Sequence, residues 1–443
     1  MNRKLRISQC MIVKNEEKNI EKALSWGKNI MWEQIVVDTG STDRTVELAK
    51  ELGAAVYHFP WINDFAAAKN YACDQASGDW IAFLDADEYM EEKDAEKVYR
   101  LIENLAENQA PYQAVITNWF HLDAGGHVFM GGIQMRFFRN RPEIRYTGRI
   151  HEYLVDGGRE LAASEVLDAC EELIIYHTGY TAQAVSDAGK TKRNEEILLS
   201  ELEKRPEDAD VMGNLADVYK AMEDYDQAIE WYKKAVHVIQ TGTAGPQIRN
   251  QRMSWTFSYL LDLLRWKKRE EEEILEVYGQ AVYYLPRESD FDYILGIHYL
   301  AKNHWEKAAH HLGRALELFE AYGSLGVGQI VAAKLMKIYE DLAISYYNAG
   351  QKEKSVQTCV SYLKENPLAM GVLKVLLTAF RGEAGDGGAG QVLDFLRQLY
   401  DFGSLKERLF VLKAAKEAGY QSIYEAVWDL FSPAEQEALA GLV

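Results

Sequence analysis

The sequence predicts an α/β domain with a mostly parallel sheet, followed by an all-α region of helical repeats. Up to about residue 180, short apolar runs alternate with segments of helical periodicity, which is the pattern of a β-α-β-α fold. Beyond that point the apolar pattern is helical and repeats along the chain. With 443 residues and 48% hydrophobic content, the chain can form more than one core, so we expect separate domains.

The strands and helices of the first domain can be placed in order. The segments predicted as strands cover residues 5–13, 34–38, 54–58 and 80–84. The segments predicted as helices cover residues 17–31, 43–52 and 65–76. In a sheet of this kind, ligands bind outside the carboxyl ends of the strands. We therefore look for functional residues directly after each predicted strand.

Two carboxylates follow the strand at residues 80–84. The apolar run ends in Asp85-Ala86-Asp87, so two acidic side chains stand one residue apart. Residues two apart point the same way from a strand, so Asp85 and Asp87 can share a hard divalent cation that binds a diphosphate. A solvated acidic turn is the alternative, because short acidic pairs are common at strand ends.

Polar residues also follow two earlier strands. Asp38 ends the second strand, where a carboxylate can accept hydrogen bonds from a uracil imide or a ribose hydroxyl. Val13 ends the first strand and is followed by Lys14 and Asn15. We expect the backbone here and the Asn15 side chain to border the same crevice as Asp38.

These motifs carry a family resemblance. Residues 11–16, 38–43 and 84–87, in this order, resemble the nucleotide-sugar motifs of family 2 glycosyltransferases with the GT-A fold. The resemblance covers about residues 5–180. Together with the repeats that follow, the chain is similar to bacteriocin peptide S-glycosyltransferases of the sublancin type. Its catalytic part also resembles lipopolysaccharide-core glucosyltransferases, which leaves the acceptor open.

The resemblance implies a UDP-sugar donor and a divalent metal, Mn²⁺ or Mg²⁺. Asp87 is the implied metal ligand, and His177 matches the histidine that completes metal coordination in this fold. An imidazole among oxygen ligands favours manganese over magnesium. Lys69 stands where many relatives have arginine, so it retains a point charge but loses bidentate geometry. The expected donor-binding residues are Val13, Asn15, Glu16, Asp38, Ser41, Lys69, Asp85, Ala86 and Arg193. Arg193 is chosen from three basic residues on the helix that leaves the domain, Lys190, Lys192 and Arg193, of which we expect one to contact the donor diphosphate.

The resemblance places the catalytic base near residue 150. In the family a carboxylate at this point deprotonates the acceptor, and the match falls on Glu152, with His151 as the neighbouring alternative. Burial beside a sugar can raise the pKa of a glutamate toward neutrality. The other interpretation is that the pair only orders the loop over the donor.

The second half of the chain repeats with a period of about 34 residues, which is typical of tetratricopeptide helix pairs. A weaker copy begins near Trp255, and a generic helical bundle is the alternative. The recurring small and large positions are Leu215, Ala216, Tyr219, Ala228, Tyr232 and Ala235; then Leu295, Gly296, Tyr299, Ala308, Leu312 and Ala315; then Leu342, Ala343, Tyr346, Ser355 and Cys359.

We therefore predict three domains. Residues 1–190 form the GT-A domain, residues 191–370 the tetratricopeptide array and residues 371–443 a C-terminal helical cap. Stacked helix pairs make an extended concave surface, so we expect the array to hold a peptide or protein acceptor. Helical arrays also associate with themselves, which makes a homodimer a reasonable expectation.

Composition narrows the possible functions and partners. A formal net charge of −19 is unfavourable for nucleic-acid binding, which relies on Lys and Arg to neutralise phosphates. The four cysteines lack metal or redox spacing, which indicates a reducing cytoplasm. No window approaches the roughly 18 consecutive apolar residues of a membrane span, so we expect no integral membrane segment.

The expected function is inverting, metal-dependent transfer of a hexose from a UDP-sugar to a peptide or protein. The first alternative keeps the enzyme and makes the acceptor a cell-envelope polysaccharide or a lipopolysaccharide core. The absence of an amphipathic basic helix disfavours it. The second alternative is a non-catalytic scaffold that only binds nucleotide sugar. The intact carboxylates Asp85 and Asp87 disfavour that one.

Overall fold

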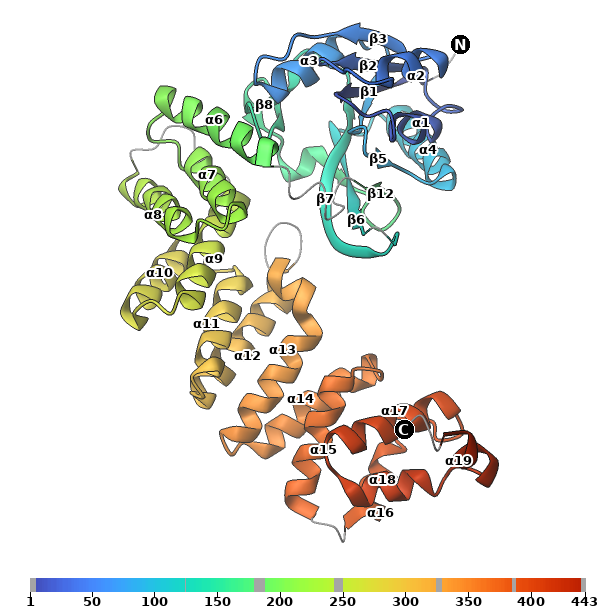
Figure 1. The fold of residues 1–443 in the computed structure, drawn as a ribbon, viewed down its shortest axis with the longest axis vertical. Helices are drawn as coiled ribbons and strands as arrows, with labels where there is room; N and C mark the ends of the chain where they lie inside the picture. The colour runs from blue at the N-terminus through green and yellow to red at the C-terminus, as the bar shows by residue number, and fades with distance from the viewer. Residues whose placement is uncertain are drawn as a thin grey trace. The chain divides into compact units, whose positions relative to one another are not determined.

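The computed structural model describes residues 5–123, 125–178, 188–242, 250–323, 329–384 and 388–439. The chain forms two compact units (Figure 1). The first, called here the α/β unit, contains Met1–Pro206 and Asp217–Asp224; the second, the helical unit, contains Glu207–Ala216 and Tyr225–Val443. Within the described ranges, no helix has the length and apolar character needed to cross a membrane.

A nine-stranded sheet forms the centre of the α/β unit, in the order β3-β2-β1-β4-β7-β6-β12-β5, with β11 paired to β6. Strand β1 pairs in parallel with β2 and β4, β2 with β3, and β6 with β11 and β12. Strand β7 runs antiparallel to β4 and β6, and β5 antiparallel to β12. The prediction of a mostly parallel sheet is confirmed. The strands are β1 (Ile7–Val13), β2 (Glu33–Asp38), β3 (Ala55–His58), β4 (Trp80–Phe83), β5 (Glu88–Tyr89), β6 (Ala114–Leu122), β7 (Val128–Arg139), β11 (Val166–Asp168) and β12 (Ile174–His177).

Helices cover both faces of this sheet, as Figure 1 shows. Because strand side chains alternate between faces, Ile81 and Phe83 of β4 enter the core with α3, while Trp80 and Ala82 enter the core with α4. Because the parallel strands are buried on both faces, their sequences are continuous apolar runs. The helices are α1 (Ile20–Ser25), α2 (Thr45–Glu51), α3 (Phe65–Gln75) and α4 (Glu92–Glu107), and a small sheet contains β8 (Ile144–Thr147), β9 (Tyr153–Asp156) and β10 (Arg159–Glu160).

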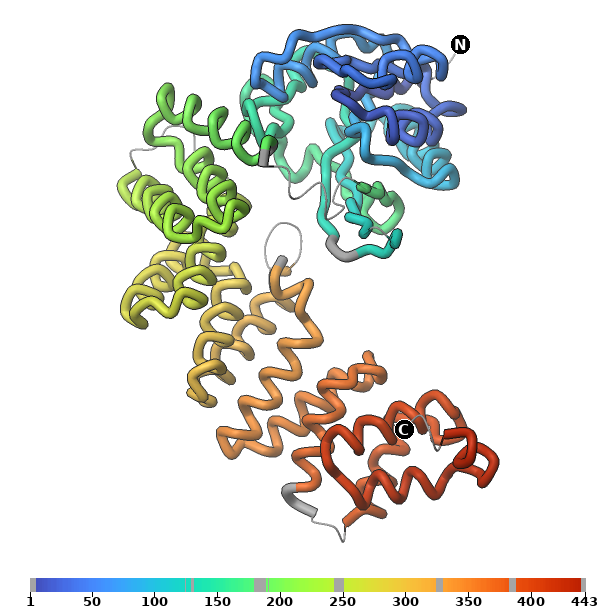
Figure 2. The backbone as a smooth tube through the Cα atoms, viewed as in Figure 1, coloured from blue at the N-terminus to red at the C-terminus, as the bar shows by residue number. Residues whose placement is uncertain are grey.

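The rest of the described chain is helical and begins with α6 (Ala188–Lys204). Four pairs of consecutive helices follow along the chain, coloured from green to orange in Figure 2. Recurring positions found in the sequence are buried, including Leu215, Ala228, Leu295, Ala308 and Ala343. The all-α prediction is therefore confirmed. The pairs are α7 (Ala209–Ala221) with α8 (Tyr225–Thr241), α9 (Asn250–Trp266) with α10 (Glu271–Tyr284), α11 (Ser289–Ala301) with α12 (Trp305–Tyr322), and α13 (Gln329–Asn348) with α14 (Lys352–Glu365).

Short helices at the end of the chain pack on the last pair. Leu396 and Leu412 belong to the same buried core as Ala343 of α13 and Cys359 of α14. These helices therefore remove apolar surface of the final pair from water. The domain boundaries at residues 190 and 370 stay a prediction. The terminal helices are α15 (Met370–Ala384), α16 (Ala389–Leu396), α17 (Leu405–Glu417), α18 (Gln421–Trp428) and α19 (Pro433–Leu439).

Two glycines of the helical unit offer a matched test of this packing. A methyl group on Gly296 in α11 would lie 2.8 Å from the Leu312 side chain of α12, whereas one on Gly279 in α10 would meet nothing within 4 Å. Alanine is the better helix former by about 1 kcal/mol, so Gly279→Ala should raise the thermal midpoint of the helical unit. Gly296→Ala should lower it, because overpacking costs about 1–3 kcal/mol. Circular dichroism during heating measures both, and equal midpoints would contradict the predicted close helix approach.

Candidate active site

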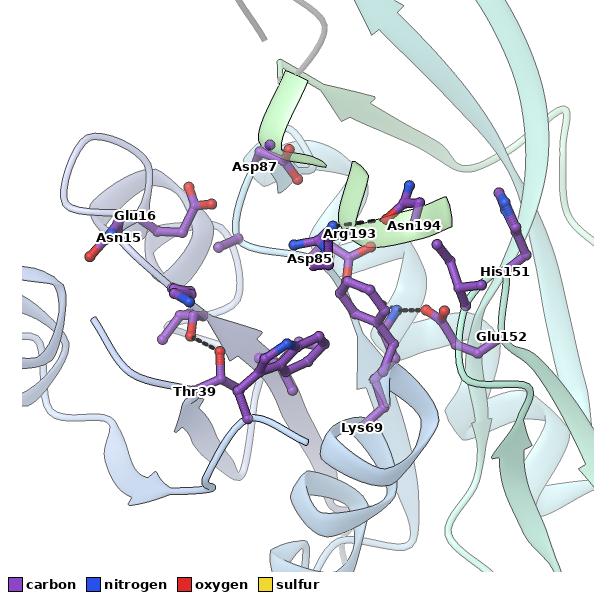
Figure 3. A pocket seen from close by; sticks show the side chains of 18 of the residues that line it. Asn15, Glu16, Thr39, Lys69, Asp85, Asp87, His151, Glu152, Arg193 and Asn194 are labelled. Atoms are coloured by element: carbon purple, nitrogen blue, oxygen red, sulfur yellow. Dashed lines mark hydrogen bonds and ion pairs between the residues drawn. The ribbon is translucent and has the colours of Figure 1, made fainter. Parts of the chain in front are cut away.

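The carboxyl ends of β1, β4 and β12 open on one cavity of about 750 Å³ in the α/β unit (Figure 3). A cavity of this volume is in the usual range for small-molecule sites, which is about 300–1,000 Å³. The lining residues come from strand ends, the start of α3, the β8–β9 connection and the start of α6. They are Ile12, Val13, Lys14, Asn15, Glu16, Thr39, Trp61, Phe65, Lys69, Asp85, Ala86, Asp87, Ile150, His151, Glu152, His177, Gly189, Arg193 and Asn194.

Most of the residues predicted from the sequence line this cavity. The exceptions are Asp38 and Ser41, whose neighbour Thr39 does line it. Asp38 is buried and accepts hydrogen bonds from the backbone amides of Ser41 at 2.9 Å and Gly40 at 3.2 Å. Burial raises the pKa of Asp38, but the hydrogen bonds from Ser41 and Gly40 outweigh it, so the pKa lies below its ordinary value. Asp38 is thus a carboxylate that shapes the β2–α2 turn.

That turn fixes Asn15. The backbone amide of Asn15 donates to Ser41 Oγ at 2.9 Å, and Asn15 Oδ1 accepts from the Thr42 amide at 2.7 Å. Asn15 has a φ of 58°, in the left-handed region that asparagine tolerates better than most residues. Ser41 therefore contributes by holding the residue that reaches the cavity wall.

Lys69 joins two of the predicted carboxylates. Its Nζ lies 2.7 Å from Glu152 Oε1 and 3.1 Å from Asp85 Oδ1, and the lysine is only 3% exposed. Burial lowers the pKa of Lys69, but Asp85 and Glu152 outweigh it and the pKa is raised. The lysine therefore stays charged, and its ammonium contacts carboxylates from two distant parts of the chain.

Arg136 is a site residue to which the sequence analysis gave no role. Its Nη2 lies 2.9 Å from Asp85 Oδ2 and also forms an ion pair with buried Glu88. Burial raises the pKa of Asp85, but Lys69 and Arg136 outweigh it and hold the pKa well below its usual range. Both oxygens of Asp85 thus face cations, which distinguishes this carboxylate from Asp87.

A β-bulge explains the position of Arg136. In the β6–β7 ladder, Val115 pairs with Phe137 and Ile116 pairs with Met135, so Arg136 has no partner across the strand pair. Bulges re-aim side chains and are frequent next to active sites. An arginine between apolar residues, in Met135-Arg136-Phe137, was the available sequence signal, but no sequence pattern fixes the position of a bulge.

Asp87 and His177 form the pair that fits a metal. Asp87 Oδ2 lies 3.1 Å from His177 Nε2, and both residues line the cavity. Burial lowers the pKa of His177, but its hydrogen bond and charge interaction with Asp87 outweigh it, so the pKa is raised. A carboxylate oxygen with an imidazole nitrogen is a donor set suited to Mn²⁺. Within the described ranges, no group of three or more His, Cys, Asp or Glu side chains is placed to hold a metal ion.

Glu152 and His151 lie in the β8–β9 connection. The Glu152 carboxylate points toward Lys69 in Figure 3, whereas the His151 ring points away from that pair. His151 is exposed and has a φ of 54°, a left-handed conformation that costs about 1–3 kcal/mol in a non-glycine residue. The structure therefore brings both candidate bases to the cavity, with different surroundings.

An aromatic wall completes the cavity. Trp61 and Phe65 pack edge to face with ring centroids 4.7 Å apart, and the Arg193 guanidinium carbon lies 5.1 Å from the Phe65 ring. Arg193 also donates to Asn194 Oδ1 at 3.2 Å. Stacking on aromatic faces is a common way to hold an arginine at a phosphate site. Trp61, Phe65 and Asn194 were not predicted from the sequence.

Comparisons with known proteins identify the domain. Residues 8–150 match the model of glycosyl transferase family 2, and residues 209–238 match that of a tetratricopeptide repeat. A TPR repeat-containing protein of Synechococcus elongatus is 30% identical over 62% of this chain and 66% of its own length. The SPbeta prophage-derived glycosyltransferase SunS of Bacillus subtilis is 28% identical over 51% of this chain and 52% of its own length. The chain thus spans less than two thirds of these relatives.

Among solved structures, S. aureus TarS 1–349 in complex with UDP-GlcNAc is 14% identical, with a TM-score of 0.35 over 64% of this chain and 92% of that chain. The family model matches the segment that carries all three strand-end motifs, and the repeat model matches the first predicted helix pair. The chain therefore contains a glycosyl transferase family 2 domain followed by tetratricopeptide repeat structure, which confirms the resemblance drawn from its motifs.

Proposed function

We propose that this chain is a metal-dependent, inverting glycosyltransferase that moves a sugar from a UDP-sugar to a peptide or protein. The observation that carries the proposal is one cavity in which Asp87 and His177 face each other while Lys69 links Asp85 to Glu152. The family 2 match over residues 8–150 covers the strand-end motifs of this cavity.

The donor diphosphate is bound beside Asp87, His177 and Arg193. Asp87 and His177 would hold the divalent cation, which would supply positive charge against the charge that develops on the departing diphosphate. Arg193 presents a guanidinium at the same wall and can pair with a phosphate oxygen. Asp85, kept ionised by Lys69 and Arg136, accepts hydrogen bonds from hydroxyl groups of the donor sugar.

Transfer is a single displacement. The acceptor atom attacks the anomeric carbon as the bond from that carbon to the diphosphate breaks, so the configuration inverts. Glu152 takes the proton of the acceptor, and UDP leaves with the electron pair. Lys69 positions Glu152 through the 2.7 Å contact and is itself anchored by Asp85, which links the base to the donor side of the cavity.

The helical unit is proposed to bind the acceptor. Stacked tetratricopeptide pairs give an extended surface suited to a peptide segment, and the resemblance to peptide S-glycosyltransferases points the same way. A homodimer and a cytoplasmic location stay predictions.

A shortened chain separates the two activities. A chain ending at Asp224 keeps every residue of the α/β unit, including the hydrogen bond from Tyr219 Oη to Glu195 at 2.8 Å. We expect this variant to hydrolyse the UDP-sugar at the rate of the full chain but to lose transfer to a peptide array. Circular dichroism checks its folding. Equal peptide transfer by both chains would reject the helical unit as the acceptor site.

The donor and acceptor classes are tested together on the full chain. UDP release is measured over a panel of UDP-sugars with Mn²⁺, with Mg²⁺ and with EDTA, first alone and then with the peptide array. Turnover with one UDP-sugar, dependent on the metal and stimulated by peptides, is the expected result. Stimulation by lipopolysaccharide core instead would favour the envelope alternative, and binding without any turnover would favour the scaffold.

A further inference from the structure

His121 of β6 contacts the proposed metal ligand from behind the cavity. It is 2% exposed, it is outside the cavity lining, and its Nδ1 lies 2.9 Å from Nδ1 of His177. The two histidines are register partners in the parallel β6–β12 pair, so they leave the sheet on the same face. The contact is thus set by the sheet itself.

Trp119 closes the contact on one side. It stands two residues before His121 on β6, and its ring centroid lies 4.1 Å from that of His121 and 5.0 Å from that of His177. The His121 and His177 ring planes cross at 87°, and their centroids lie 4.8 Å apart. This packing restricts rotation of both imidazoles.

Valence then determines which nitrogen carries the proton. In a hydrogen bond between two Nδ1 atoms, one atom donates and the other accepts. A neutral histidine that binds a cation through Nε2 carries its proton on Nδ1. When His177 Nε2 serves the site beside Asp87, His177 Nδ1–H must donate and His121 Nδ1 must accept.

We propose that His121 is a positioning residue, which accepts the Nδ1 proton of His177 and so turns the Nε2 lone pair of His177 toward the cavity. This inference rests on the proposed function, because it takes the site between Asp87 and His177 to hold a divalent cation. Partners of this kind behind a metal-binding histidine typically contribute 10–100-fold in metal affinity.

Two substitutions separate hydrogen bonding from packing. His121→Phe keeps a ring of similar size beside Trp119 but removes the acceptor, whereas His121→Asn is smaller and restores an acceptor oxygen near the position of Nδ1. Mn²⁺ affinity is measured in the full chain with saturating UDP and no sugar donor, from the electron paramagnetic resonance signal of free Mn²⁺. UDP affinity in EDTA, by calorimetry, reports whether each variant keeps its fold.

The expected result is a 10–100-fold weaker Mn²⁺ affinity for His121→Phe, a loss of less than about fivefold for His121→Asn, and unchanged UDP affinity in EDTA. In a His177→Ala background, His121→Phe should cause no further loss, because His121 acts through His177. Three results would overturn the inference. His121→Phe could bind Mn²⁺ as tightly as wild type, His121→Asn could lose as much Mn²⁺ affinity as His121→Phe, or His121→Phe could lower Mn²⁺ affinity further in the His177→Ala background. Wild-type protein that takes up no Mn²⁺ with UDP would instead overturn the proposed metal-dependent function, and the inference with it.

Discussion

Asp87→Ala is expected to abolish metal-supported turnover of the UDP-sugar. Asp87 supplies the carboxylate oxygen that faces His177 Nε2 at 3.1 Å, and no third side chain of this kind joins them within the described ranges. Its loss would leave His177 as the other proposed ligand among the described residues. The charge stabilisation supplied by a metal amounts to several kcal/mol, so turnover should fall by at least about 10³-fold.

The measurement is UDP release with Mn²⁺, beside Mn²⁺ affinity in the presence of UDP. Glu51→Ala is a matched control, because Glu51 is an exposed carboxylate at the end of α2, outside the cavity lining. Glu51→Ala should keep wild-type UDP release and wild-type Mn²⁺ affinity. If Asp87→Ala retains turnover within about tenfold of wild type, Asp87 is not the metal ligand.

Glu152→Gln is expected to keep donor binding and lose transfer. Glutamine preserves the size of the side chain but cannot take the acceptor proton, and general base catalysis contributes about 10²–10⁴-fold. The substitution does not leave the buried Lys69 ammonium without a counter-ion, because Lys69 keeps its 3.1 Å ion pair with Asp85. The affinity for UDP with Mn²⁺ should therefore stay near the wild-type value, while kcat for transfer should fall by about 10²–10⁴-fold.

His151→Ala is the control for this assignment. His151 lines the same cavity and neighbours Glu152, but its ring is exposed and points away from the Lys69 pair (Figure 3). Its loss should change transfer much less than Glu152→Gln does. If His151→Ala is the inactive variant and Glu152→Gln turns over normally, the base has been assigned to the wrong residue.

Patterns within short stretches of sequence predicted those parts of the fold and site that depend on residues close together in the chain. Apolar strands ending in polar residues predicted where Val13, Asp85 and Asp87 stand, and parallel pairing brings those strand ends to one edge. Repeating small positions such as Ala228 and Ala308 predicted the helix pairs, because close packing of helices requires small side chains at fixed spacing.

The contacts that the sequence did not predict depend on pairing between strands that are far apart in the chain. Arg136, which contacts Asp85, stands at a bulge in β7, and His121 meets His177 through the β6–β12 register, across 56 residues. Lys69 was expected to bind the donor, but it forms ion pairs with Asp85, which follows β4, and with Glu152 of the β8–β9 connection. A single sequence contains no signal for such register and bulge positions, because any apolar strand of suitable length satisfies the same pattern.

The cation site itself is tested most directly by anomalous diffraction from crystals grown with UDP and Mn²⁺. We expect a manganese peak in contact with Asp87, His177 and the diphosphate of UDP. UDP bound in the cavity with no manganese between these two side chains, or manganese bound elsewhere, would contradict it.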